Sequence, residues 1–162
     1  MLRFLQVCFY FCLIALLVSC NSQSSPSEQA DSRGNASVKK AIKTNNAPEP
    51  VGPYSQAVRV GNTLYLAGQI AIRPESGEMV TTTIEEEAQQ VMHNLQAVLQ
   101  EAGMDMSHVV KTTIYMTDLN NFGKVNEIYG SYFGEIPPAR VTVGVASLPK
   151  GANLEISMVA VE

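Results

Sequence analysis

Two charged side chains near the end of the chain have residue types that could do chemistry. Arg140 opens one alternating run, and Glu155 stands just inside a second run, 154–161. A guanidinium is always charged and binds anions through paired N–H donors, whereas a carboxylate accepts protons and hydrogen bonds. Each charge lies within otherwise apolar sequence. The first question is therefore which face of the fold these two side chains occupy.

Both runs have the two-residue period of a β-strand, and a Pro-Lys-Gly turn joins them. One face of the first run carries Val141, Val143 and Val145, and the other carries Arg140, Thr142 and Gly144. The apolar face of the second run carries Leu154, Ile156, Met158 and Ala160. We therefore expect Arg140 and Glu155 at the starts of two strands, on the face that does not feed the core.

The default interpretation of such charges is simple exposure to solvent on the outer face of a sheet. Two details favour a covered face instead. Val159 and Val161 make the same face partly apolar. Pro137-Pro138 fixes the backbone just before Arg140 and limits where its side chain can go. Both interpretations remain open from the residues alone.

The elements that must position these side chains can be read in order along the chain. Strand runs at 57–60 and 63–67 flank Gly61-Asn62, which is a strong hairpin signal. Thr83 and Glu86 have capping-box spacing before a helical apolar stripe that Gly103 ends. A strand at 109–116 and a second helix after Asp118 precede the two final strands.

The resulting order is β-β-α-β-α-β-β, which predicts an α+β fold. Two helices on one face of a mixed sheet is the simplest arrangement of these elements. No helix then remains to cover the other face. If that face is partly apolar, oligomerisation would cover it.

The acidic and histidine side chains give no metal site. Glu85, Glu86 and Glu87 lie in the first turn of the predicted helix, where its dipole favours anions. We interpret them as a helix start and not as ligands. His93 falls away from the apolar stripe, and His108 has no partner at metal-ligand spacing. We therefore expect no metal.

The N-terminus has the pattern of a targeting segment. Arg3 precedes an apolar run at 4–18, which is short for a membrane span, and Leu17-Val18-Ser19-Cys20 resembles a bacterial lipobox. We expect residues 1–20 to be a lipoprotein signal peptide and Cys20 to carry the lipid anchor. Residues 21–38 would be a polar tether, and residues 39–162 the domain. Alternatives are an ordinary secretory signal or a short anchor.

This interpretation predicts a lipid-anchored protein of the cell envelope, by default in the outer membrane because no Asp follows Cys20. The three cysteines are Cys8, Cys12 and Cys20, so the mature domain would hold no thiol. A disulfide framework and a cysteine nucleophile are thereby excluded for that domain.

Composition bounds the remaining classes. The 162 residues are 46% hydrophobic and 16% charged, enough for one domain with a real core. The formal net charge is −4, and no basic tract is present. A nucleic-acid partner is therefore not expected, because such proteins neutralise phosphates with clustered lysine and arginine.

From about residue 39 to Glu162 the chain resembles the RidA/YjgF family of enamine/imine deaminases. The resemblance rests on six short pieces in order: Gly52-Pro53-Tyr54, Ala67-Gly68-Gln69-Ile70, Val110-Lys111-Thr112-Thr113, Val125-Asn126-Glu127-Ile128-Tyr129, Pro138-Ala139-Arg140 and Leu154-Glu155-Ile156. Any one piece is weak, but all six at this spacing make a strong match.

The resemblance implies a chorismate-mutase-like fold, a homotrimer with clefts between subunits, and hydrolysis of 2-aminoacrylate and related imines without metal or organic cofactor. Arg140 matches the arginine that grips the substrate carboxylate, and Glu155 matches the acid that holds and polarises the attacking water. The matching substrate-binding positions are Tyr54, Gly68, Asn126 and Thr142.

Two departures and one discord accompany this resemblance. Ala67 stands where a serine is common, and Ala71 where a proline is common, so substrate preference could differ. An exported protein would also meet imines other than those made by cytoplasmic dehydratases. The sequence therefore leaves two hypotheses: an exported imine/enamine deaminase, or a non-catalytic module that uses the same cleft to bind a small carboxylate or aid a partner protein.

Overall fold

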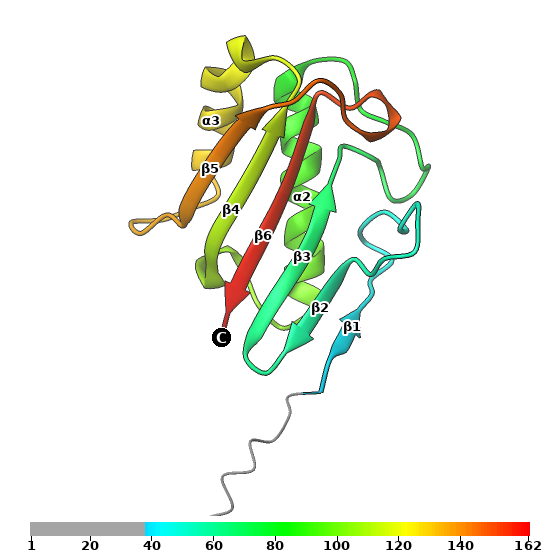
Figure 1. Cartoon of the computed structure of the whole chain (residues 1–162), viewed down its shortest axis with the longest axis vertical. Helices are drawn as coiled ribbons and strands as arrows, with labels where there is room; N and C mark the ends of the chain where they lie inside the picture. Colours follow the sequence, from blue (N-terminus) through cyan, green and yellow to red (C-terminus); the bar gives the residue numbers. More distant parts are fainter. Residues whose placement is uncertain (1–37) are drawn as a thin grey trace, which may run out of the picture. The chain divides into compact units, whose positions relative to one another are not determined.

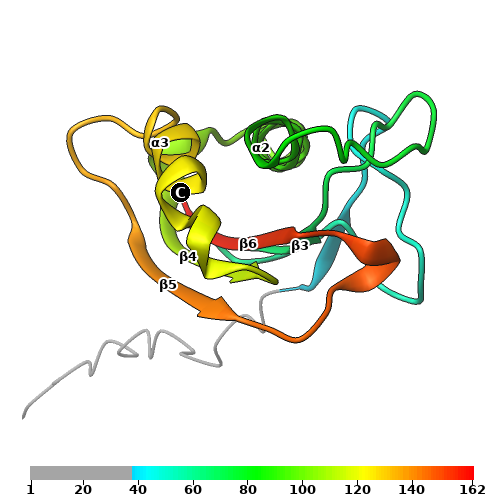
Figure 2. The same ribbon diagram turned by 90° about the horizontal axis from the view of Figure 1, so that it is seen from above.

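A six-stranded mixed sheet carries two α-helices on one side (Figures 1 and 2). The computed structural model describes residues 38–162. The strands are β1 (Lys40–Ile42), β2 (Ala57–Val60), β3 (Thr63–Gln69), β4 (Val109–Met116), β5 (Ala139–Gly144) and β6 (Leu154–Val161). The helices are α2 (Ile84–Glu101) and α3 (Phe122–Gly130), with single 3-10 turns at Met106–His108, Leu119–Asn121 and Pro149–Gly151. The predicted fold class, α+β with both helices on one face, is confirmed.

Local sequence signals set the helix ends. The Thr83 hydroxyl accepts a hydrogen bond from the Glu86 N–H and caps α2, as predicted. Gly103 has φ +76° just past the helix, a left-handed conformation that favours glycine. Asp118 caps the 3-10 turn that leads into α3, and α3 buries Val125 and Tyr129.

The strand order is β1-β2-β3-β6-β4-β5, so β6 lies between the hairpin and β4. Only β4 and β5 run parallel; the other neighbours are antiparallel. The register of β3 against β6 shifts between Leu66 and Gln69. The predicted order lacked β1. Its three residues are too short to show a period, and pairing with β2 defines it as a strand.

The two faces of the sheet differ in what covers them. The helix side holds the core, which includes Leu64, Leu95, Leu99, Ile114, Leu154 and Ile156, none more than 1% exposed. We call the side without helices the open face. Tyr65, Val141 and Val143 lie on it, 52%, 45% and 38% exposed. This face is therefore partly apolar and is uncovered in a single chain, as is common for surfaces that meet another subunit.

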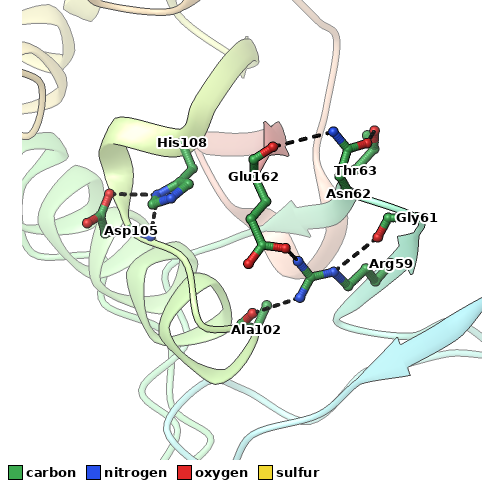
Figure 3. A network of polar contacts seen from close by, with 8 residues as sticks. All are labelled: Arg59, Gly61, Asn62, Thr63, Ala102, Asp105, His108 and Glu162. Carbon is green, nitrogen blue, oxygen red and sulfur yellow. Dashed lines mark hydrogen bonds and ion pairs between the residues drawn. The ribbon is translucent and has the colours of Figure 1, made fainter.

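Polar contacts tie the C-terminus to the end of α2 (Figure 3). Arg59 pairs with the Glu162 carboxylate and donates to the carbonyl of Ala102 at 3.1 Å. Nearby, Asp105 caps the turn Met106–His108, and the His108 ring contacts Asp105 and its backbone N–H. His108 is thus part of a helix cap, and His93 is exposed on α2 as predicted.

Within residues 38–162, no helix is both long and apolar enough to cross a membrane. The same part of the chain has no cluster of three His, Cys, Asp or Glu side chains that could hold a metal ion. Cys20, the predicted lipidation site, and the signal-peptide prediction for residues 1–20 lie outside the described residues.

Candidate active site

Arg140 lies on the helix side of the sheet, not on the open face. Its register partner on β4 is Thr112, which is fully buried beneath α3. The prediction that Arg140 and Thr142 point away from the helices is therefore wrong, and so is the expectation that Val141 and Val143 feed the core. The error has a physical cause: β5 places its valines on the open face, so hydrophobic alternation cannot distinguish the core side of β5 from its other side.

The Arg140 guanidinium rests on a shelf made by α3, which we call the aromatic shelf (Phe122 and Tyr129). Its central carbon is 4.9 Å from the Tyr129 ring centre and 5.5 Å from the Phe122 ring centre. One nitrogen donates to Asn126 Oδ1 at 2.8 Å. Cation–π contacts and this hydrogen bond orient the group without neutralising it. In residues 38–162 no carboxylate pairs with Arg140, so its charge is available to a ligand.

Polar side chains beneath and beside Arg140 complete this end of the site. The Tyr129 hydroxyl donates to Thr112 Oγ1 at 3.1 Å, which fixes the ring under the guanidinium. Desolvation raises the pKa of the Tyr129 phenol, partly offset by the Thr112 bond and the Arg140 charge. Thr142 follows Arg140 on the same side of β5, and its Oγ1 is buried without a partner in the described structure. A ligand atom held by Arg140 could satisfy that hydroxyl.

Replacing Tyr129 with phenylalanine is expected to lower the free energy of unfolding by about 1–2 kcal/mol, because the buried Thr112 hydroxyl loses its partner. Urea denaturation measures the change. The matched control is Tyr132→Phe, since the Tyr132 hydroxyl makes no hydrogen bond within residues 38–162. Equal stability of the Tyr129→Phe and Tyr132→Phe proteins would contradict a structural role for the Tyr129–Thr112 bond.

Glu155 lies on the open face, as predicted, in register with Tyr115 of β4. It lines an apolar hollow of about 290 Å³. The other lining residues are Val51, Tyr54, Ala67, Gly68, Ile70 and Pro149. Burial among these groups raises the pKa of the Glu155 carboxyl above its ordinary value, since desolvation disfavours the charged form. A carboxylate with a raised pKa is a better proton acceptor at neutral pH.

Gly68 and Tyr54 shape the surroundings of that carboxylate. A Cβ built on Gly68 would overlap the carboxyl group, with Glu155 Cδ only 2.8 Å away, so only glycine leaves room for it. Tyr54 is 48% exposed, and its hydroxyl accepts from the Val51 N–H at 3.3 Å, which closes the loop at the rim of the hollow. Both predicted positions thus lie beside Glu155.

The six predicted site residues of the described region form two groups within one chain. Arg140, Asn126 and Thr142 gather on the helix side of the edge strand β5. Tyr54, Gly68 and Glu155 gather on the open face around β3 and β6. The strand register places the two groups on opposite faces of the sheet. Because β4 separates β5 from β6, they are also about 10 Å or more apart across the sheet. A single chain does not bring Arg140 and Glu155 together.

Comparison with known proteins places this arrangement in a family. The profile described as "Endoribonuclease L-PSP" matches residues 44–162, and solved structures named for RidA and YjgF align with the chain. The chain belongs to the RidA/YjgF family. The profile match includes every predicted site residue of the described region, from Tyr54 to Glu155.

Members of the RidA/YjgF family are similar to this chain over almost their whole length. A RutC family protein of Pyrococcus abyssi is 51% identical over 123 residues, covering 76% of this chain and 97% of its own. The 2-iminobutanoate/2-iminopropanoate deaminase of Mus musculus is 47% identical, covering 77% and 93%. The structure of E. coli TdcF with bound serine shares 37% identity at a TM-score of 0.73, covering 76% and 98%.

Sequence reasoning missed several residues that support this RidA/YjgF-type site. The aromatic shelf was not predicted as part of the site, although its Phe122 is 40% exposed and its Tyr129 is 4% exposed beneath Arg140. Glu87 lies in the first turn of α2, as predicted, but it is also buried and contacts the residues just before Glu155, which was not predicted. A signal was present, because Glu87 stands four residues before Val91 and so falls on the apolar stripe of α2.

A larger hollow of about 630 Å³ lies on the helix side, near the 3-10 turn Met106–His108 and the segment 131–136. Its charged lining residues are the two acids Asp105 and Glu135, so it offers no cationic side chain to bind a carboxylate. Size alone therefore does not identify the site. The smaller hollow at Glu155 combines a carboxylate of raised pKa with an apolar wall.

Proposed function

We propose that this protein hydrolyses reactive enamine/imine carboxylates of the 2-aminoacrylate and 2-iminopropanoate type to 2-keto acids and ammonia. The observation that carries the proposal is Arg140, a guanidinium oriented by the aromatic shelf and Asn126 and paired with no carboxylate of residues 38–162. Such a group is suited to a planar carboxylate. Curated relatives named 2-iminobutanoate/2-iminopropanoate deaminase support the reaction type.

In this reaction Arg140 binds the substrate carboxylate and Glu155 holds a water molecule against the imine carbon. The substrate reacts as its imine tautomer with the nitrogen protonated. The water oxygen forms the new C–O bond as the C=N π bond breaks, and Glu155 takes one proton of the water, which gives a neutral carbinolamine. Glu155 then returns this proton to the nitrogen. The C–N bond breaks and ammonia leaves, while the hydroxyl proton passes to Glu155 as the carbonyl forms and from there to the released ammonia or to solvent. No electrons are exchanged, so the side chains need only position the reactants and move protons.

The proposed site forms between subunits of a homotrimer. Within one chain the Arg140 and Glu155 groups lie on opposite faces of the sheet, so a neighbouring copy must bring one group to the other. The open face offers Tyr65, Val141 and Val143 for such an interface. Size-exclusion chromatography with light scattering tests the assembly. A monomer with full activity would contradict the shared site.

The activity itself is tested by generating 2-aminoacrylate or 2-iminopropanoate in situ and following keto-acid formation with the purified full-length chain. An acceleration above the uncatalysed rate that scales with protein concentration is expected. Bovine serum albumin at equal concentration controls for general base effects of protein. No acceleration with any imine carboxylate would exclude the proposed reaction.

Gly68→Ala is expected to lower kcat about 10- to 100-fold while leaving the fold intact. Gly68 has ordinary backbone angles, so alanine fits the main chain, but its Cβ would push the Glu155 carboxyl group aside. A displacement of about 1 Å at a reacting group can cost on the order of 100-fold in rate. Steady-state kinetics measures the loss. Gly130→Ala, where a Cβ meets nothing within 4 Å, is the matched control.

A second candidate function is binding of a small carboxylate without turnover. The relative TdcF, whose structure contains bound serine, favours this alternative. The same Arg140 would serve either function. Nuclease activity, which the family description names, has less support here, because a chain of net charge −4 offers little attraction to RNA phosphates.

We further propose that the domain works in the cell envelope on a lipid anchor at Cys20. The support comes from sequence: the apolar run at 4–18 ends in Leu17-Val18-Ser19-Cys20, and the family match starts later, at residue 44. Labelled palmitate should enter the wild-type chain and not a Cys20→Ser variant, and membrane fractionation should follow the label. A chain that stays unlabelled and cytoplasmic would overturn this assignment.

A further inference from the structure

A buried carboxylate on α2 is bonded to the chain just before Glu155. Glu87 is 1% exposed. Its Oε1 accepts from the backbone N–H of Asn153 at 2.7 Å and from that of Leu154 at 3.2 Å. Its Oε2 accepts from Asn153 Nδ2 at 3.1 Å. All three bonds thus go to the two residues that immediately precede Glu155.

These bonds fix the entry into β6. Asn153 is held from its other side by Thr117, whose N–H donates to the Asn153 carbonyl at 3.1 Å and whose hydroxyl donates to Asn153 Oδ1 at 3.3 Å. The backbone at 153–154 is therefore anchored in two directions. Because β-strand side chains alternate, the orientation of this backbone decides the direction in which Glu155 leaves it.

A second polar side chain of α2 anchors the other side of the hollow. Asn94 is 1% exposed, and its Nδ2 donates to the carbonyls of Ile70 at 3.1 Å and Ile72 at 2.9 Å. Gln90 donates to Asn94 Oδ1 and so orients the amide. Asn94 follows Glu87 by two helical turns on the same side of α2, about 10 Å along its axis. One helix face thus holds the segments that follow Gly68 and precede Glu155.

We propose that Glu87 is a positioning residue for Glu155, with Asn94 in the same role for the Gly68 side of the hollow. The inference rests on the proposed function for its kinetic consequence, but its geometry does not depend on that function. The three bonds of Glu87 all go to residues 153 and 154, so they act on the backbone from which the Glu155 side chain leaves. Groups that hold a reacting side chain must be set within a fraction of an ångström.

The test compares Glu87→Gln with Glu87→Leu in the full-length chain. Glutamine keeps an acceptor for both backbone N–H groups, and the Asn153 amide can rotate to match it. Leucine has a similar size and removes the acceptor of three donors, of which the Leu154 N–H is buried. We expect kcat of the leucine variant to fall about 10- to 100-fold, with KM within about 2-fold of wild type. The glutamine variant should stay near wild type in both constants. A merely structural role would lower stability and leave kcat unchanged.

Two further measurements keep the proposal testable in every case. If the leucine variant does not fold, Asn153→Ala decides, because this exposed residue loses its Nδ2 bond to Glu87 and its bond from the Thr117 hydroxyl. A several-fold lower kcat supports positioning, and an unchanged kcat overturns it.

If the wild type hydrolyses no imine, the proposed function fails. The ¹³C signal of the Glu155 carboxyl at fixed pH then decides: a shift in Glu87→Leu, absent in Glu87→Gln, supports positioning, and no shift overturns it.

Discussion

Arg140→Ala is expected to lower kcat/KM for imine hydrolysis about 100- to 1000-fold. The guanidinium is the cation of the proposed site, and removing one partner of a charge-assisted pair costs about 2–5 kcal/mol, with 1.4 kcal/mol for each factor of ten. The loss should appear largely in KM, since the carboxylate is bound before and during the reaction. Arg140→Lys should recover only part of it, because lysine keeps the charge and loses the two-pronged geometry and the stacking on the aromatic shelf.

Arg73→Ala is the matched control for this prediction. Arg73 is exposed in the turn after β3, and it makes no ion pair within the described residues. Its removal changes net charge by the same amount and should leave both kinetic constants unchanged. Full activity of Arg140→Ala would remove Arg140 from the substrate-binding site and with it the main support for the proposed reaction.

Local signals explain why most of the fold could be predicted from the sequence. The Thr83 cap and Gly103 define α2 because both act on neighbouring backbone groups. The hairpin at Gly61-Asn62 pairs Val60 with Thr63, as its turn residues predicted. Such features depend on a few consecutive residues, so they can be predicted without knowing the tertiary structure.

The parts of the site that could not be predicted depend on tertiary register and on neighbouring surfaces. Arg140 was placed on the wrong face because the valines of β5 form an open apolar face. Apolar alternation assigns such residues to the core of the same chain. The residues of a subunit interface show the same alternation, so the pattern does not distinguish the two. The target of Glu87 lies 66 residues away along the chain, and no local pattern encodes that contact.

The placement of Glu155 carries a cost to folding that follows from its chemistry. Desolvation alone accounts for the raised pKa of this carboxyl, and within residues 38–162 it has no cationic partner. A desolvated and unpaired carboxylate destabilises the folded chain when it is ionised. A residue that served only stability would not be an unpaired carboxylate in an apolar hollow. A substitution of Glu155 should therefore lower activity and raise stability.

Glu155→Gln is expected to lower kcat about 100- to 10,000-fold, because an amide cannot take the proton from water. Binding of the product keto acid should change little, since Arg140 holds the carboxylate in either candidate function. Turnover measured together with calorimetric binding thus distinguishes an enzyme from a binding module. The exposed Glu86→Gln is the matched control and should behave as wild type. Unchanged turnover in Glu155→Gln would exclude Glu155 as the group that activates water.

The same variant should unfold at a higher temperature than wild type at pH 7. The folded-state pKa of Glu155 is raised, so its contribution favours folding below the unfolded-state pKa and is lost as pH rises through the folded-state value. At neutral pH the ionised group therefore destabilises the wild type, and glutamine removes that effect. The difference in melting temperature should shrink as pH falls toward 4.5, the ordinary value. The acid limb of the wild-type kcat profile should lie above that pH for the same reason. A variant less stable than wild type at pH 7 would show that the carboxylate has a stabilising partner in the assembled protein.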